Sequence, residues 1–529
     1  MYILCLMKKR TTNGEKIVMA NNSKNKGTTA KRSNKKKDKI RNNIKIVGYI
    51  ICAVQLLLSI LATVYVIRLK IVPTSYIVII DILLLILIVL FVLMQRWSVP
   101  GVIASFTSLI ISCLLVIGCF YINFTYKKLK GMSGVDTKID NVNVYVRAED
   151  SAQSIYDASG YSFGILKDLD RENTDKTIDD IQNIIGQNIS VTEYNTALDL
   201  VKGLYNNETQ AIILNDAYIS FVKDSEGFDD VESRIRSIYN ASFESEISTE
   251  EDIPDDYLNN GDRVFTILLN GVDTRGRTIT NSNSDTNILM TVNLDTHQIL
   301  MISTPRDYFI PLSISGNSRD KLTHSGAYGV DVTIDTLEML YNVNIDNYVR
   351  INFDGFIDVI DALDGITVYS EYEFDGFDND VVNMTYHFNQ GYNDVNGKQA
   401  LLFARERHAF SEGDRQRGKN QMAVIEGMID KATSPQILKN YTDIWNEVSD
   451  CVVTSMEYDE IADFVKFQLE DSPKWDIVKY SVTGSDSMST TYSTGDAEVY
   501  VMIPDEATVN QAKEYLRQIY NNETVIISE

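Results

Sequence analysis

The first 125 residues contain three long apolar runs separated by short connections. Residues 46–67 and 101–124 carry no charged side chain, and residues 76–94 carry one, Asp81. Each run is long enough to cross a hydrocarbon core of roughly 30 Å as a helix. The connections contain Pro73 and Pro100, which favour breaks between helices. The pattern therefore predicts a membrane-spanning domain of three transmembrane helices at residues 46–124.

Beyond the apolar runs, a first mixed pattern extends over residues 126–251. Residues 142–146 alternate between apolar and polar side chains as in a strand, and residues 161–166 and 211–214 are typical of further strands. Residues 178–185 and 194–205 have helical spacing. The acidic stretch 244–256, which contains Pro254, indicates a linker. We predict a small α/β accessory domain that ends at this linker.

A second mixed pattern follows over residues 257–525. Strands are predicted at residues 264–269, 287–293, 298–303, 348–351, 365–369, 475–480 and 499–503. Helices are predicted at residues 331–341, 353–363, 398–404, 414–432 and 507–520, with a Ser/Thr/Gly-rich loop at 483–495. Strands that alternate with helices favour an α/β fold of layered sheet and helices.

Charge gives the chain an orientation. The tail of residues 1–45 contains 14 Lys or Arg and two acids, Glu15 and Asp38. Subtracting this excess of 12 from the net charge of −24 leaves −36 for the remaining residues. A basic tail before the first span predicts a cytoplasmic N-terminus, so that residues after about 125 are extracellular. A nucleic-acid-binding arm is the alternative interpretation, but we expect a disordered topology signal and no nucleic-acid partner.

The sequence contains three charged clusters, two of which follow or begin predicted strands at the ends where ligands bind in α/β sheets, while the third follows the predicted helix at 398–404. They are Gly-Val-Asp-Thr-Arg-Gly at 271–276, Ser-Asp-Thr at 284–286 leading to Pro-Arg-Asp at 305–307, and Ala-Arg-Glu-Arg-His at 404–408 with Asp414, Arg417 and Gln421. Carboxylates suit a hard divalent cation, and guanidiniums bind phosphate oxygens through two parallel hydrogen bonds. The combination indicates a site for a diphosphate.

Arg405 and Arg407 set a condition on the local backbone. Residues two apart point to nearly opposite sides of a helix and share a face only in an extended chain. If both arginines bind one ligand, the helix at 398–404 must end there. In the next helix Asp414, Arg417 and Gln421 fall on one stripe, beside an apolar stripe that packs inward.

Other chemistries lack their motifs in this sequence. We find no Gly-x-Ser-x-Gly elbow, Walker loop, Cys-x-x-Cys or His-Glu-x-x-His. The four histidines show no metal-binding spacing, and we interpret His408 as structural. Taken singly, Asp273 and Arg275 could be turn residues, and Arg405 and Arg407 could be surface partners of Glu406. Phosphoryl transfer needs charge neutralisation and in-line placement, which the clusters supply jointly.

The order of these motifs resembles the LytR–CpsA–Psr family of bacterial cell-envelope proteins. The stretches that carry the resemblance are ILLNGVDTRG, SDTNILMTVN, ISTPRD, DKLTHSGAYG, NFDGFIDVIDALDGITV, NGKQALLFARERH and GDRQRGKNQ. Three spans followed by an accessory domain are similar to the family's capsule-type branch in Gram-positive bacteria. Many members place an arginine just before the acid of Ser-Asp-Thr. Here Ser282, Asn283 and Ser284 stand there, and Arg277 is a candidate to replace it.

The resemblance implies an enzyme that takes a glycopolymer, whether teichoic acid, capsule or another polymer, from an undecaprenyl-diphosphate carrier. It attaches the polymer through a phosphodiester to a peptidoglycan hydroxyl, and a pyrophosphatase side activity is possible for such a site. The resemblance also implies roles for individual residues. Asp273 and Asp285 would hold Mg²⁺ or Mn²⁺; Arg405, Arg407 and Asp414 would be catalytic; and the diphosphate would be bound by Arg275, Arg306, Arg405, Arg407, Arg417 and Gln421.

Two other function classes stay open at this stage. Proteins of this family have been described as transcriptional attenuators, although the tail is membrane-anchored and no helix-turn-helix pattern is present. A non-catalytic protein that binds a polyprenyl phosphate or a glycan could use the same cleft. The accessory region has no cluster of carboxylates with arginines. We therefore expect it to be dispensable for the basic chemistry, and we place Lys321 and His324 outside the site.

Overall fold

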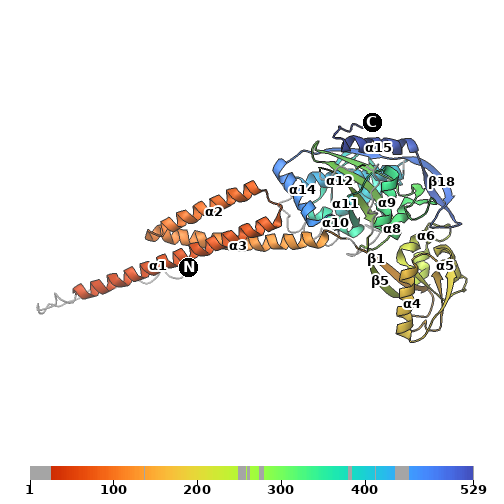
Figure 1. Cartoon of the computed structure of the whole chain (residues 1–529), viewed down its shortest axis with the longest axis horizontal. Coiled ribbons are helices and arrows are strands. Elements are labelled where there is room, and N and C mark those ends of the chain that lie inside the picture. Colours follow the sequence, from red (N-terminus) through yellow and green to blue (C-terminus); the bar gives the residue numbers. More distant parts are fainter. Residues whose placement is uncertain are drawn as a thin grey trace. The chain divides into compact units, whose positions relative to one another are not determined.

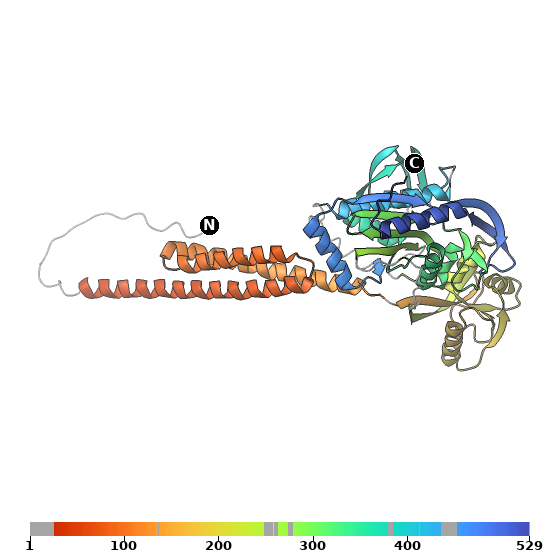
Figure 2. The same ribbon diagram turned by 45° about the horizontal axis from the view of Figure 1, so that its top comes forward.

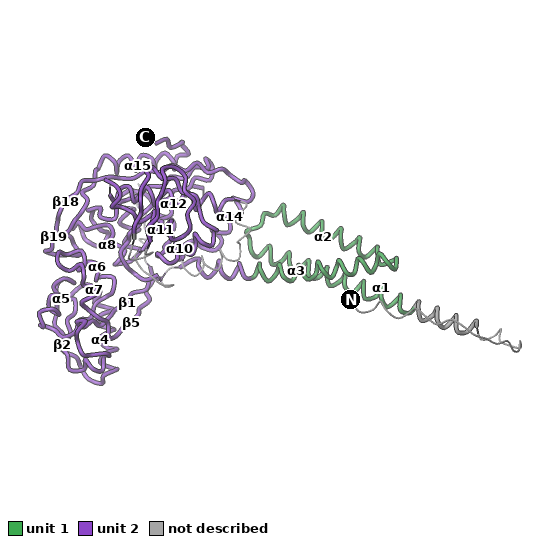
Figure 3. Tube along the Cα trace, turned by 180° about the vertical axis from the view of Figure 1, so that it is seen from behind, with its two compact units in different colours: residues 1–123 green, residues 124–529 purple. Residues whose placement is uncertain are grey.

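The computed structural model describes residues 26–135, 137–247, 258, 263–272, 279–378, 384–411, 413–434 and 452–527, with side chains from residue 39. The chain divides into two compact units, Met1–Asn123 and Phe124–Glu529, which Figure 3 colours separately. The predicted boundary between accessory and catalytic domains, at about residues 251–257, lies outside the described residues and stays a prediction.

The first unit consists of long apolar helices, as the sequence predicts. They are α1 (Lys26–Leu69), α2 (Thr74–Met94) and α3 (Ser98–Met132), which run alongside one another in Figure 2. Within the described residues, these three helices are long and apolar enough to cross a membrane. Cys52, Phe91 and Ala104 pack together between them. Asp81, the acid within α2, accepts a hydrogen bond of 2.7 Å from the Thr63 hydroxyl, so its carboxylate is paired across two helices.

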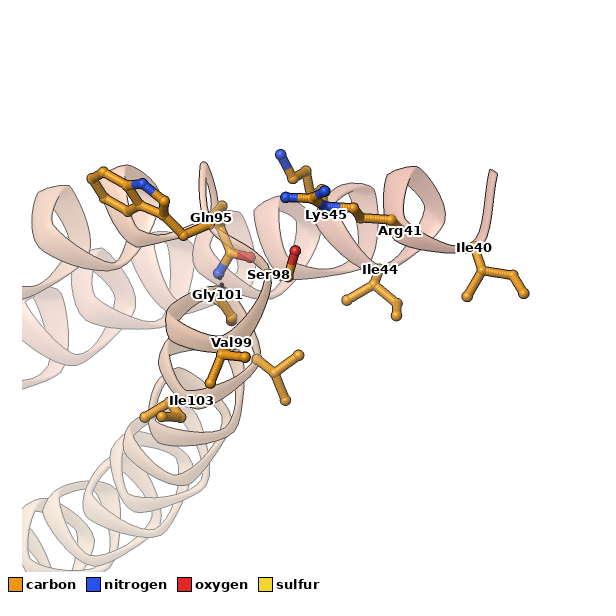
Figure 4. Close-up of a pocket in the computed structure, with 11 residues that line it drawn as sticks. Ile40, Arg41, Ile44, Lys45, Gln95, Ser98, Val99, Gly101 and Ile103 are labelled. Carbon is orange, nitrogen blue, oxygen red and sulfur yellow. Dashed lines mark hydrogen bonds between the residues drawn. The ribbon is translucent and has the colours of Figure 1, made fainter. Parts of the chain in front are cut away.

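A pocket of about 510 Å³ lies at one end of this unit, between residues 40–45 of α1 and the connection from α2 to α3 (Figure 4). Gln95 is buried there and donates to the Gly101 carbonyl at 3.2 Å. Lys45 Nζ donates to the Arg96 carbonyl at 2.9 Å. Arg41 also lines the pocket, so basic side chains gather at this end of the helices.

The second unit begins with a five-stranded sheet of order β3-β2-β4-β1-β5. Its core is formed by alternating apolar residues such as Val142, Val144 and Val146, all fully buried. Its strands are β1 (Thr137–Arg147), β2 (Ser162–Leu166), β3 (Ser190–Tyr194), β4 (Ala211–Asn215) and β5 (Ile235–Glu246). Its helices are α4 (Arg171–Ile185), α5 (Ala197–Tyr205), η1 (Asp216–Tyr218), α6 (Ile219–Lys223) and α7 (Val231–Arg234).

A six-stranded mixed sheet of order β16-β11-β6-β7-β8-β17 forms the centre of the rest of this unit (Figure 1). Its strands are β6 (Val264–Val272), β7 (Ser284–Asn293), β8 (Gln298–Ser303), β11 (Asn347–Asn352), β16 (Val452–Thr454) and β17 (Asp476–Ser481). One face packs on α8 (Leu322–Tyr328), α9 (Val330–Tyr341) and α15 (Glu506–Tyr520). The other packs on α12 (Asp414–Ala432) and α14 (Tyr458–Asp471). The expected layered α/β architecture is confirmed.

Smaller elements complete this part of the fold. A second core joins α10 (Phe353–Ala362) and α11 (Gly397–Arg405) to the pairs β12–β15 and β13–β14. The strands of these pairs are β12 (Ile366–Ser370), β15 (Gly391–Val395), β13 (Phe374–Asp378) and β14 (Met384–Phe388). Two further pairs are β9 (Phe309–Pro311) with β10 (Arg319–Lys321), and β18 (Gly484–Thr490) with β19 (Glu498–Pro504).

Three predicted segments differ from the structure. Residues 244–246, assigned to the linker, complete β5, whose polar side chains line a strand that pairs along the whole of β1. Residues 484–490, assigned to a loop, form β18 against β19. Residues 190–194 form β3, and the helix expected from residue 194 begins only after Thr196, whose hydroxyl caps α5. Each of these segments is rich in polar residues, so no apolar periodicity in the sequence marks it as a strand.

Candidate functional site

One edge of the central sheet collects the ends of four strands. β6 and β11 run parallel, and β7 runs antiparallel to both β6 and β8. The last residues of β6, β8 and β11 and the first residues of β7 therefore lie at the same edge. Asp285 in β7 and Arg306 just after β8 come from this edge. Asp273 and Arg275 follow β6 directly, but they lie outside the described residues.

Asp285 and Arg306 form a mostly buried ion pair at this edge. The Arg306 Nη1 atom donates to Asp285 Oδ1 at 2.6 Å, and the two side chains are 17% and 18% exposed. The Thr323 hydroxyl lies 3.4 Å from the same carboxylate oxygen. Burial by itself lowers the pKa of Arg306, but the charges of Asp285 and Asp307 outweigh it and raise that pKa above its ordinary value. Arg306 is therefore fully charged and fixed in place.

The cluster continues inward through Asp307 and Lys321. Lys321 Nζ lies 2.8 Å from Asp307 Oδ1, and it also contacts Asp224 Oδ2 at 2.5 Å. Burial lowers the pKa of Lys321, yet the charges of Asp307 and Asp224 raise it overall. The buried His324 ring lies between Asp320, at 2.7 Å, and Asp224, at 3.3 Å. Sequence reasoning placed Lys321 and His324 outside the site and did not consider Asp224, which the structure joins to both.

Helix α12 brings its first turns to the same edge. A Cβ atom on Gly418 would lie 2.6 Å from the Ser303 hydroxyl, so α12 approaches the end of β8 closely here and a side chain at this position would displace that hydroxyl. Asp414, at the start of α12, pairs with Arg417. Burial raises the pKa of Asp414 above its ordinary value of 3.8, although the charge of Arg417 opposes the shift. Gln421 lies one further turn along the helix and is half-buried.

Arg405 and Arg407 satisfy the predicted backbone condition. Helix α11 ends at Arg405, and Glu406 is extended with φ −64° and ψ 128°. The Arg405 guanidinium lies 4.6 Å from the centre of the Phe353 ring, just after the end of β11. Arg407 is exposed, with its Nε atom 3.5 Å from the His408 ring.

The Glu406 carboxylate has a structural role. It accepts hydrogen bonds from the backbone N–H groups of His408, Ala409 and Phe377 at 2.7, 3.0 and 3.2 Å. These bonds hold the turn that follows α11 and so fix where Arg405 and Arg407 leave the helix.

Of the two acids predicted to hold a divalent cation, the structure describes Asp285. Mg²⁺ is commonly held by one or two carboxylates together with phosphate oxygens of the substrate. Both described contacts to Asp285, from Arg306 and Thr323, fall on its Oδ1 atom. The described residues contain no group of three or more His, Cys, Asp or Glu side chains placed to hold a metal by themselves. A cation here would therefore depend on the phosphates of the ligand.

The structure thus brings together Asp285, Arg306, Asp414 and Arg417, which influence one another electrostatically. Arg405 lies beside Phe353, which follows the end of β11, and Arg407 is exposed on the turn after α11. The residues of this cluster that sequence reasoning did not name are Asp224 and Thr323, whereas Asp307 belongs to the second charged motif. Thr323 carries a signal in the sequence, because it lies within the stretch DKLTHSGAYG. Asp224 carries none.

Comparison with known proteins assigns this domain. Residues 233–517, more than half of the chain, match the model of the LytR_cpsA_psr family. Similar proteins include the polyisoprenyl-teichoic acid–peptidoglycan teichoic acid transferases TagU of Bacillus licheniformis and Bacillus subtilis. Each is 36% identical over 200 residues, which are 38% of this chain and 62% of the relative. The chain thus spans less than two thirds of the length of these relatives.

Solved structures with some likeness include Bacillus subtilis TagV, at 28% identity and a TM-score of 0.41, covering 50% of this chain and 99% of TagV. TagT bound to LI-WTA is 24% identical with a TM-score of 0.40, covering 52% of this chain and 99% of TagT. The assignment rests on the family match over residues 233–517, and this chain belongs to the LytR_cpsA_psr family.

Proposed function

We propose that this protein transfers a glycopolymer from a polyprenyl-diphosphate carrier to a hydroxyl of peptidoglycan and forms a phosphodiester. The observation that carries the proposal is the buried cluster of Asp285, Arg306, Asp414 and Arg417 at the strand ends of a LytR_cpsA_psr domain. The names of the TagU relatives, with teichoic acid as the polymer and peptidoglycan as the acceptor, support the same reaction class. Teichoic acid is the polymer that these names favour, and capsule is the alternative.

Each step of the proposed reaction uses groups of this edge. Arg306, Arg405 and Arg417 bind oxygens of the diphosphate, with Arg275, Arg407 and Gln421 as further contacts. The acceptor hydroxyl oxygen bonds to the phosphorus that carries the polymer, and the bond from that phosphorus to the bridging oxygen breaks. Prenyl phosphate leaves, and the proton of the hydroxyl passes to the Asp414 carboxylate. A bound Mg²⁺ or Mn²⁺, held by Asp273 and Asp285, would neutralise phosphate charge.

The raised pKa of Asp414 predicts a pH dependence. A general base acts only when it is ionised, so the rate should rise as pH increases through the pKa of Asp414. Because burial raises that pKa above 3.8, the rise should occur at higher pH than for an ordinary aspartate. The profile of turnover against pH measures it. The Asp414→Asn variant should lose most activity and show no such limb; persistence of the limb in that variant would assign it to another group.

A reconstituted transfer reaction tests the function. The full chain in detergent, with Mg²⁺, a prenyl-diphosphate-linked oligosaccharide and peptidoglycan, is expected to form a phosphodiester-linked product and release prenyl phosphate. Hydrolysis of the donor without an acceptor would reveal the proposed pyrophosphatase side activity. Tight binding of the donor without either reaction would instead support a non-catalytic binding protein. A regulator acting through its tail would tolerate loss of Arg306 and Arg405, which the transferase should not.

We propose further that α1, α2 and α3 anchor the chain in the cell membrane of a Gram-positive bacterium, with residues after about 125 outside. The 14 basic residues before residue 46 support this orientation, and Arg96 lies at the same end of the helices as Lys45. Reporter fusions at Lys36 and Gly131 should therefore report opposite compartments. If both reporters respond in the same compartment, the number of crossings is even and this orientation is wrong.

A further inference from the structure

An ion network joins the predicted accessory region to the candidate site. Asp224 follows helix α6 of the accessory region, and its Oδ2 atom contacts Lys321 Nζ at 2.5 Å and His324 Nε2 at 3.3 Å. Lys321 also contacts Asp307 Oδ1 at 2.8 Å. Asp307 lies 3.8 Å from the Nε atom of Arg306. The network thus runs from Asp224 to the arginine that holds Asp285.

The network is shielded from solvent, so each charge depends on its partners. The side chains of Lys321, Asp307 and Asp224 are 6%, 11% and 20% exposed. A buried ammonium needs compensating charge. Here one carboxylate comes from each side of the contact between the accessory and catalytic regions. Salt screens buried pairs less than surface pairs. The charges of Asp224, Lys321 and Asp307 therefore affect one another strongly.

Aromatic packing between α6 and α8 fixes the direction from which Asp224 approaches Lys321 and His324. The Phe221 ring of α6 contacts the His324 ring edge-on, with 4.8 Å between centroids, and lies 5.5 Å from the Tyr328 ring. Ala327 of α8 is part of the same buried cluster as Phe221 and Val222. Helix α8 therefore packs against the accessory core, and its Thr323 hydroxyl lies beside Asp285. A shift of α6 would be transmitted to the site.

We propose that Asp224 is a positioning residue for the diphosphate site: it holds Lys321 and His324 so that Asp307 and Arg306 keep Asp285 in place. The accessory region is then required for full turnover, contrary to the expectation from sequence that it is dispensable. This inference rests on the proposed transferase function. Asp224 does not touch substrate, and its effect acts through Lys321.

The full chain in detergent tests the proposal through its transfer kinetics and melting curve. In Asp224→Asn the buried Lys321 keeps one carboxylate partner and draws Asp307 away from Arg306. The expected result is a kcat lower by at least about tenfold, with the KM for a prenyl-diphosphate-linked oligosaccharide changed by less than about twofold. Asp224→Glu, which keeps the charge, should recover part of the kcat.

The matched control is another ion pair between the same two regions. Lys138 of β1 contacts Asp331 of α9 at 2.7 Å, with side chains 15% and 11% exposed. The Lys138→Gln variant weakens this junction, including the bond from Lys138 to the Tyr328 carbonyl at the end of α8, but it removes no contact of Asp224, Lys321 or Asp307. Its kcat should stay within about twofold of the wild type. If kcat falls in parallel in Lys138→Gln and Asp224→Asn, following the loss of melting temperature, Asp224 acts only as a structural tie and the proposal is wrong.

A double variant covers the case in which Asp224→Asn does not fold. Asp224→Asn with Lys321→Met removes one buried charge of each sign, so the net charge of the network is unchanged and the chain should melt above Asp224→Asn. Its kcat should nevertheless stay at least about tenfold low, because Asp307 has lost its contact with Lys321. Wild-type turnover in either variant overturns the proposal while the transferase function stands. Absence of transfer by the wild-type chain itself overturns both.

Discussion

Replacing Arg306 by methionine is expected to lower the rate of glycopolymer transfer by at least about a hundredfold. The guanidinium binds Asp285 at 2.6 Å and lies 3.8 Å from Asp307. Each lost charge-assisted contact costs about 1.5–3 kcal/mol, and about 1.4 kcal/mol corresponds to a factor of ten in rate. Removing one partner of a buried ion pair also destabilises the fold by about 3–5 kcal/mol. Initial rates and melting curves of the full chain measure both effects.

The Arg306→Lys variant separates these two effects. Lysine keeps a positive charge near Asp285, so the melting temperature should recover most of its loss. It cannot form the two parallel hydrogen bonds that a guanidinium makes to a phosphate, so the rate should stay about tenfold or more below wild type. A wild-type rate for Arg306→Lys would show that this arginine serves the fold and not the diphosphate.

Replacing Arg405 or Arg407 by lysine is expected to reduce transfer by about tenfold to a hundredfold each, because the charge remains but the planar guanidinium is lost. Arg405 is half-buried over the Phe353 ring, and Arg407 is exposed. Neither belongs to an apolar core, so the melting temperature should change little. The measurement is the transfer rate of each variant, alone and combined, alongside a melting curve.

Arg517→Lys is the matched control for these two substitutions. Arg517 lies on α15 and pairs with Glu514 at 2.8 Å and Glu523 at 3.1 Å, with 43% of its side chain exposed. Exposed pairs of this kind contribute little to stability, and its transfer rate should equal that of the wild type. Full activity in the Arg405→Lys, Arg407→Lys double variant would show that neither arginine at the end of α11 belongs to the diphosphate site.

The elements with strong periodicity were predictable from the sequence. Helix α12 has an apolar stripe from Met422 to Ile429, and its observed bounds, Asp414–Ala432, match the prediction. The break after Arg405 followed from the need of two arginines to share a face, and the extended Glu406 confirms it. Strand β8, all of whose residues are buried, also has the predicted bounds of residues 298–303.

The polar strands could not be predicted in the same way. In β5 the side chains of residues 242–246 are half-buried or exposed, so no apolar face marks the strand. Its existence depends on pairing with β1, from Thr137 opposite Glu246 to Arg147 opposite Ile235. In β7 the buried Ser284 and Asn287 bind each other and Asn270, which extends the strand past the expected start at residue 287.

Some residues of the candidate site could likewise be predicted from the sequence, and others could not. Asp285 and Arg306 lie next to strands and within motifs, so spacing along the chain was enough to propose them together. Asp224 lies 97 residues before Lys321, and the loop that carries it has no feature that points to a site. Only the packing of α6 against α8 makes it a neighbour. Asp273 and Arg275 stay predictions, since they lie outside the described residues.

The most direct test of the central claim is an experimental structure of the full chain with a bound prenyl diphosphate and Mg²⁺. The account predicts the two phosphates at the edge of the central sheet where β6, β8 and β11 end, within hydrogen-bonding distance of Arg306 and Arg405, with the cation against Asp285. A diphosphate bound elsewhere on the chain, with Arg306 still paired only to Asp285, would contradict it.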